Sequence, residues 1–230
     1  MKEGLLGKIE GVGHWRINVR PASAPAKPYH LMECKEAVEK SSVSIRGWDF
    51  PHVSYRNDEH GGYENQSEYI ENWTEWSGFN EFWRIYRSSQ FLSYISLRED
   101  TNPLGDGLSY KNTLNVTGTI YQFTEIFEFC HRMNNIGFYK TGVSVYVSLR
   151  NTAGRSLSVG QGRMPFFPDR STNAQTIDVE THLNSDELKQ RYRDHAISLC
   201  VEIFDRFAWK PDPSQLKADQ EGFYRQEWRY

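Results

Sequence analysis

The chain has little of what would place it in a specialised class of protein. Its 230 residues include only three cysteines, Cys34, Cys130 and Cys200, and no two of them are closely spaced. Their number and spacing exclude a disulfide framework and a paired-cysteine zinc site, and favour a reduced, intracellular protein. No apolar run approaches the ~20 residues of a membrane span, and the first residues lack the apolar segment of a signal peptide. We therefore expect a cytoplasmic protein with no membrane partner.

A large excess of either charge is also missing. The formal net charge is -3 and the isoelectric point is about 6.2, which argues against binding nucleic acid or anionic lipid over the whole surface. Local basic patches stay compatible with this balance. Aliphatic residues are sparse too, because all apolar residues together make up 38% of the chain while aromatic residues alone make up 14%. Much of the core must therefore be built from rings.

Hydrophobic periodicity predicts a mixed fold. Trp15, Ile17 and Val19 alternate with polar residues, which is typical of a half-buried strand whose other face carries His14, Arg16 and Arg20. Further strands are expected in the aromatic region, with a turn at 87–90, and at 142–150, 157–159 and 176–183, and helices at 31–40, 119–134 and 184–209. We expect 142–150 and 157–159 to form a hairpin.

We read residues 1–210 as a single α+β domain, in which a mainly antiparallel sheet packs with three to four helices. Residues 211–230 are charged but contain Phe223, Tyr224, Trp228 and Tyr230. A tail with this many rings is expected to dock on the domain or on a partner.

The most distinctive segment lies between Arg46 and Arg98. It contains thirteen aromatic residues: Trp48, Phe50, Tyr55, Tyr63, Tyr69, Trp73, Trp76, Phe79, Phe82, Trp83, Tyr86, Phe91 and Tyr94. Arginines interleave with the rings, as they do in surfaces that bind single-stranded nucleic acid. Acidic residues outnumber these arginines, however, which disfavours a phosphate-binding groove. The block is therefore interpreted as a ring-built core whose exposed rings, a Trp among them, would mark a protein-docking site.

The candidate binding residues come from this block, from a glycine-rich loop and from the tail. They are Arg46, Trp48, His52, Trp83, Arg84, Arg87, Arg163 and Trp228. Arg84, Arg87 and Arg163 carry the alternative interpretation, a nucleic-acid or nucleotide-binding module.

Residues suited to catalysis do not assemble into a complete active site. Asp178, Glu180 and His182 alternate on one face of a predicted strand and are candidate metal ligands, although no family spacing accompanies them. Glu33-Cys34-Lys35 matches half of a metal-dependent nuclease motif but has no acidic partner between Gly11 and Met32. We therefore favour a protein that is not an enzyme, with no cofactor and no metal. A divergent metal-dependent nuclease or hydrolase is the third interpretation.

Two runs resemble segments of uncharacterised bacterial proteins. They are Ser44-Ile45-Arg46-Gly47-Trp48-Asp49-Phe50-Pro51-His52 and Phe82-Trp83-Arg84-Ile85-Tyr86-Arg87-Ser88-Ser89-Gln90-Phe91. In some of those proteins the similar region follows a Schlafen-type, AlbA-like DNA-binding domain. The resemblance covers the central third of the chain and transfers no residue role. It implies the region standing alone, joined by a separate partner protein, in a mobile or anti-phage context. The leading hypothesis is thus a non-catalytic interaction or sensor subunit that binds another protein in a bacterial defence assembly.

Overall fold

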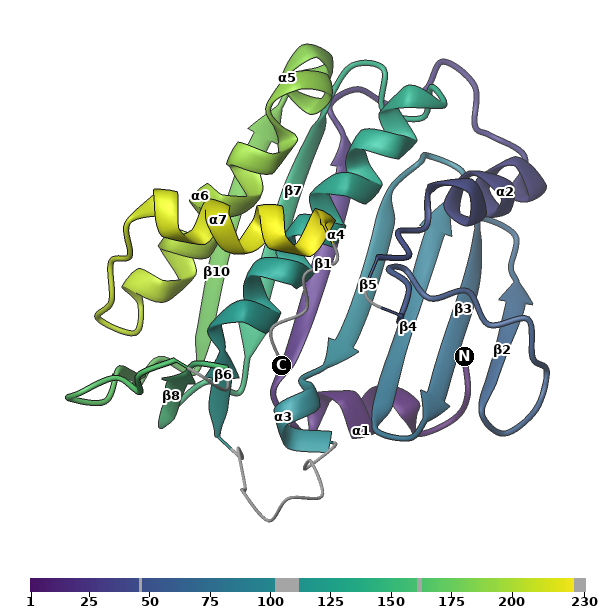
Figure 1. Ribbon diagram of the computed structural model, residues 1–230. Helices are drawn as coiled ribbons and strands as arrows, with labels where there is room; N and C mark the ends of the chain where they lie inside the picture. Colours follow the sequence, from purple (N-terminus) through teal and green to yellow (C-terminus); the bar gives the residue numbers. More distant parts are fainter. Residues whose placement is uncertain (46, 102–111, 161–162, 226–230) are drawn as a thin grey trace.

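The computed structural model describes residues 1–45, 47–101, 112–160 and 163–225. Its centre is a seven-stranded antiparallel sheet with the order β10-β7-β1-β5-β4-β3-β2 (Figure 1). Its strands are β1 (His14–Pro21), β2 (Gly61–Asn65), β3 (Tyr69–Trp76), β4 (Phe79–Tyr86), β5 (Phe91–Ser96), β7 (Val143–Arg150) and β10 (Thr176–Leu183). A small second sheet consists of β6 (Thr113–Asn115), β8 (Arg155–Ser158) and β9 (Ser171–Thr172).

The helices cover the two faces of the main sheet unequally. They are α1 (Leu5–Glu10), α2 (Leu31–Ser41), α3 (Arg98–Thr101), α4 (Val116–Asn135), α5 (Ser185–Gln190), α6 (Tyr192–Asp205) and α7 (Pro213–Tyr224). In Figure 1, α2, α4, α5 and α6 lie in front of the sheet, and α7 crosses over α4 and α6. The chain therefore forms a single α+β domain, as the sequence predicts.

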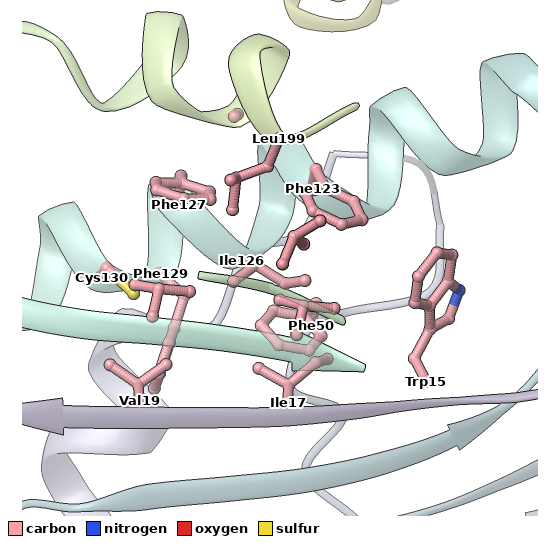
Figure 2. Packing of buried hydrophobic residues seen from close by; sticks show 14 of the residues in the cluster. Trp15, Ile17, Val19, Phe50, Phe123, Ile126, Phe127, Phe129, Cys130 and Leu199 are labelled. Atoms are coloured by element: carbon pink, nitrogen blue, oxygen red, sulfur yellow. The ribbon is translucent and has the colours of Figure 1, made fainter. Parts of the chain in front are cut away.

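The main core lies between the sheet and this helix layer. Figure 2 shows Trp15, Ile17 and Val19 on β1 facing the rings and aliphatic side chains of α4. α4 begins where the Asn115 side chain accepts a hydrogen bond from the Gly118 N–H, at 2.7 Å. Its apolar residues recur at three and four, so one long face of the helix is buried. Each large side chain buried there contributes about 1.5–3 kcal/mol.

The aromatic block supplies rings to both faces of the sheet. Phe50 and Phe91 pack edge-on at 6.3 Å, and Phe91 lies 4.7 Å from Phe129 of α4. On the other face, Phe82 and Trp73 pack against α1, whose Leu5 and Ile9 are fully buried. Part of the block is thus core, which accounts for its ring content without a ligand.

Two elements differ from the sequence prediction. The hairpin expected between 142–150 and 157–159 is wrong, because β7 pairs with β1 and β10 on its two edges and leaves no room for β8. β8 instead pairs with β6 and β9, and its buried Arg155 bonds to Asp100 through two nitrogens, at 3.1 and 2.7 Å. The helix expected over 184–209 is two helices, because Arg191 leaves the helical region at a φ of -130°.

The C-terminal helix α7 docks on α4 and α6. Leu216 and Phe223 are buried there, and Phe223 stacks on Tyr121 at 4.5 Å. The contact is completed by a buried carboxylate, since Glu128 accepts hydrogen bonds from the hydroxyls of Tyr192 and Tyr224 at 2.7 and 3.0 Å. Trp228 and Tyr230 lie outside the described residues. None of the described helices is long and apolar enough to cross a membrane.

Candidate functional site

Exposed apolar side chains gather along one border of the sheet. The described residues include seven large exposed hydrophobics: Met32, Tyr55, Tyr63, Trp76, Ile136, Met164 and Phe167. Of the first four, Tyr63 lies on the outer strand β2, Tyr55 in the segment before it, Trp76 at the end of its partner strand β3, and Met32 on α2. We call these four residues the aromatic edge. Single exposed apolar residues are normal on a protein surface, whereas several of them in one region are the usual mark of an interaction surface.

Two cations connect the members of the aromatic edge. The Lys35 ammonium lies 5.6 Å from the centroid of the Tyr63 ring, and its pKa responds to both Tyr63 and Tyr55 after the larger effect of its hydrogen bond to Glu39. Met32 is one helical turn before Lys35 on α2, so the two share a face. The Arg56 guanidinium lies 4.9 Å from the Trp76 ring. Lys35 thus lies beside the two tyrosines, and Arg56, next to Tyr55 in the chain, lies beside Trp76.

Local backbone features hold Trp76 at the surface. It is the last residue of β3 and pairs with Phe79, the first residue of β4. Between them Ser77 and Gly78 have φ values of 49° and 83°, which is the pattern of a tight type I′ hairpin turn. A ring beside such a turn lies at the end of the sheet, and Trp76 is 48% exposed.

The loop that carries Tyr55 and Arg56 is clamped to the sheet. The buried amide of Asn72 accepts from the Ser54 N–H at 3.0 Å and donates to the Ser54 carbonyl at 2.9 Å. Because both hydrogen bonds are buried, this loop position is held firmly. The aromatic edge is therefore pre-ordered, which lowers the entropy lost when a partner binds.

An open hollow of about 480 Å³ adjoins Trp76. Lys2, Glu59, His60 and Glu75 contribute to its wall. Glu75 forms ion pairs with Lys2 at 2.8 Å and with Lys8. The hollow offers space beside an exposed Trp for a partner's side chain, the arrangement in which interface anchors pack.

The cations of the aromatic edge are paired with carboxylates. Lys35 bonds to Glu39 at 2.9 Å, and Arg56 approaches Asp58 to 3.5 Å. A phosphate backbone needs cations that are free of acidic neighbours. The patch thus suits a protein surface better than nucleic acid.

Trp48 and His52, predicted to bind a partner, belong to a ring stack at the end of β4. His52 and Phe79 lie parallel to the Trp48 ring, with centroids 4.1 and 3.8 Å away. Two rings this close cannot share one side of the indole, so both faces of Trp48 are covered. Burial lowers the pKa of His52. The indole N–H donates to Glu81 at 2.7 Å, which leaves Trp48 little to offer a ligand.

The other predicted binding residues do not form one site. Trp83 is 2% exposed and donates to the His52 carbonyl, so its ring belongs to the core. Arg84 lies on the opposite sheet face and pairs with Glu71. Arg87 bonds to the Tyr29 carbonyl at 3.1 Å, and Arg163 pairs with Asp219 of α7. Arg46 and Trp228 are outside the described residues.

The metal-ligand candidates stay apart. Asp178, Glu180 and His182 share the exposed face of β10, where the His182 Nε2 lies 3.9 Å from a carboxylate oxygen of Glu180. Within the described ranges no group of three His, Cys, Asp or Glu side chains could hold a metal ion. In the nuclease-like triplet, Glu33 accepts from the His30 N–H as a helix cap, and Cys34 is buried. Both residues thus have structural roles.

The sequence contained one usable signal for the aromatic edge. Ser77-Gly78 between two aromatic-rich strands indicates a hairpin turn, and a ring next to that turn is bound to lie at the sheet end. Tyr55, Tyr63 and Met32 had no such signal, because their exposure depends on how the loop and α2 pack. Comparison with protein-family models, with curated proteins and with solved structures gives no match for this chain.

Proposed function

We propose that the protein is a non-catalytic binding subunit that docks on another protein through the aromatic edge. The observation that carries this proposal is the gathering of Met32, Tyr55, Tyr63 and Trp76 around β2. Tyr, Trp, Met and Arg are the residue types enriched in protein interfaces, and Trp, Tyr and Arg dominate their binding energy. Arg56 stacked on Trp76 combines two of these types in one contact.

The position of β2 supports a protein as the occupant. β2 is the last strand in the sheet order, so one of its edges is not paired with any described strand. A partner segment lying against the rings would run beside this free edge, where backbone N–H and C=O groups can form additional hydrogen bonds. Binding a small ligand would not require an unpaired strand edge. The partner is thus expected to present an extended, apolar segment.

Truncating the rings should weaken the complex strongly. Trp76→Ala combined with Tyr55→Ala removes a stacked anchor, and hot-spot anchors contribute about 2 kcal/mol or more, or roughly a 30-fold change in Kd. The measurement is quantitative affinity capture, followed by native mass spectrometry and titration of the purified partner.

Phe167→Ala provides a matched control, because Phe167 is 99% exposed but lies outside the aromatic edge. We expect this variant to retain the partner with unchanged affinity. A complex that survives loss of Trp76 and Tyr55, or that depends on Phe167 instead, would contradict the proposed interface. So would the failure of wild type to capture any partner under conditions where its neighbouring gene products are present.

A further inference from the structure

The sheet face opposite the main helix layer is largely open. Alternation along β1 sends Ile17 and Val19 into the core and Arg16, Asn18 and Arg20 to the other side. Among the described helices, α1 contacts this face, at β4 and β5. In Figure 1 the main helix layer is in front, so this face is turned away from the viewer. The middle strands β1 and β7 thus present a polar surface to solvent.

Two arginines lie on adjacent strands of this open face. In the register of β1 and β7, Arg16 lies opposite Ser148 and His14 lies opposite Arg150. The Arg150 Nε donates to the hydroxyl of Ser148, the residue opposite Arg16, at 2.8 Å. Ser148 is fully buried beneath these side chains. The Arg16 guanidinium lies 5.7 Å from the Tyr94 ring centroid, which orients it from the other side.

These guanidinium groups lack the carboxylate partners that most exposed arginines have. Neither Arg16 nor Arg150 lies within 4.0 Å of a carboxylate oxygen of the described residues, and the buried Arg16 Nε has no hydrogen-bond partner. A buried N–H without an acceptor costs about 1–3 kcal/mol. The structure thus contains a donor without an acceptor next to a second, unpaired cation.

Acidic residues flank this pair on the neighbouring strand β10 and on α1. On β7, β1 and β5, which are described throughout, the open face carries no Asp or Glu. Asp178 on the neighbouring β10 lies opposite Ser148 and acts on Tyr146, and Glu10 of α1 acts on His14. His14 is 5% exposed, and its Nδ1 lies 2.9 Å from the Val12 carbonyl. Its ring stacks on Tyr94, the same ring that Arg16 approaches.

We propose that Arg16 and Arg150 form an oxyanion site that binds a phosphate group. Guanidinium groups are planar forks whose donors match phosphate oxygens, and two of them with no carboxylate oxygen of the described residues within 4.0 Å recognise phosphate better than an isolated lysine would. Arg20 lies four residues along β1 from Arg16, or roughly 13 Å at the strand rise. It is exposed and could contact a second phosphate of a longer ligand.

The test is a titration of the protein with inorganic phosphate, a 5′-mononucleotide and a single-stranded oligonucleotide. Calorimetry and fluorescence anisotropy measure the binding affinity of each probe. Arg16→Gln and Arg150→Gln should each weaken binding about tenfold, since a charge-assisted contact contributes ~1.4 kcal/mol or more. Arg206→Gln is the matched control, because Arg206 is an exposed arginine at the end of α6, on the helix side. Equal binding by all variants, or binding of no probe, would overturn the proposal.

The probes also distinguish the source of the phosphate. If the ligand is a nucleic-acid backbone, the oligonucleotide binds more tightly than the mononucleotide, Arg20→Gln weakens it further, and each lost arginine lowers the salt slope by about one. If a single phosphate is the ligand, phosphate and mononucleotide bind alike and Arg20→Gln has no effect. Trp76→Ala should leave either result unchanged, so this test is independent of the aromatic edge.

Discussion

Trp76 and Trp83 come from the same aromatic block, yet they occupy opposite environments. Trp76 is 48% exposed at a hairpin turn, whereas Trp83, seven residues later on β4, is 2% exposed in the main core. The indole N–H of Trp83 bonds to the His52 carbonyl, and the Trp76 ring stacks with Arg56. Residue type is identical in the two cases. Position relative to the sheet decides which ring stabilises the fold and which is available to a partner.

Among the described residues, charged side chains on the two sides of β1 differ in the same way, because those on one side are paired and those on the other are not. On the helix side, the carboxylate of Glu128 is surrounded by donors. On the open side, Arg16 and Arg150 have no carboxylate within 4.0 Å among the described residues. Satisfied buried charges hold elements together, while unsatisfied surface cations leave capacity for a ligand.

The largest expected effect is a difference in the free energy of unfolding between the alanine variants of the two tryptophans. Trp83→Ala removes a fully packed ring and should lower the free energy of unfolding by about 3–5 kcal/mol. Trp76→Ala changes an exposed position and should alter it by about 0.5 kcal/mol or less. Urea unfolding followed by circular dichroism measures both. If the two variants were equally destabilised, the assignment of Trp76 to a free surface would be wrong.

A smaller effect is expected at Glu128 between α4 and α7. Burial acts to raise its pKa, but hydrogen bonds from Tyr192, Arg132 and Tyr224 outweigh burial and lower the pKa. A lowered folded-state pKa stabilises the fold above the ordinary carboxyl range, and this stabilisation is lost as the pH falls through the folded value. Glu128→Gln should thus cost about 1.5–3 kcal/mol at pH 7 and progressively less in acid.

Urea unfolding of wild type and Glu128→Gln at several pH values between neutral and acid tests this prediction. Glu202→Gln is a suitable control, because Glu202 is exposed on α6. A difference between Glu128→Gln and wild type that stays constant over the whole pH range would show that the carboxylate charge does not contribute. Proteolysis at the α6–α7 connection would report whether α7 is the element released.

Local sequence patterns predicted most elements but not their partners. Trp15, Ile17 and Val19 identify β1 and also place Arg16 on its other face, because alternation is a property of the strand itself. The pairing of β1 with β7 was not predictable, since it depends on packing between segments more than a hundred residues apart. The same limit explains the wrong hairpin at 157–159.

The candidate site was less predictable than the fold. Trp48 and Trp83 were chosen for their residue type, but the structure covers both faces of one and buries the other. Trp76 was present in the same block and differed only in lying beside Ser77-Gly78. Exposure results from tertiary packing, so rings of one type cannot be ranked from composition.

The smallest expected effect concerns the unpaired arginines and tests the charge contrast directly. Arg150 makes a hydrogen bond to Ser148 but has no carboxylate within 4.0 Å among the described residues, and both Arg150 and Arg16 are close enough to act on His14. Arg150→Gln can keep the hydrogen bond while removing the like-charge repulsion. We expect its stability to equal that of wild type within about 0.5 kcal/mol. Because salt screens repulsion, wild type should gain slightly more stability from added sodium chloride than the variant. Urea unfolding at low and high salt measures this difference. If Arg150→Gln lowered the free energy of unfolding by more than about 1 kcal/mol, this guanidinium would stabilise the fold and would not be available to bind an anion.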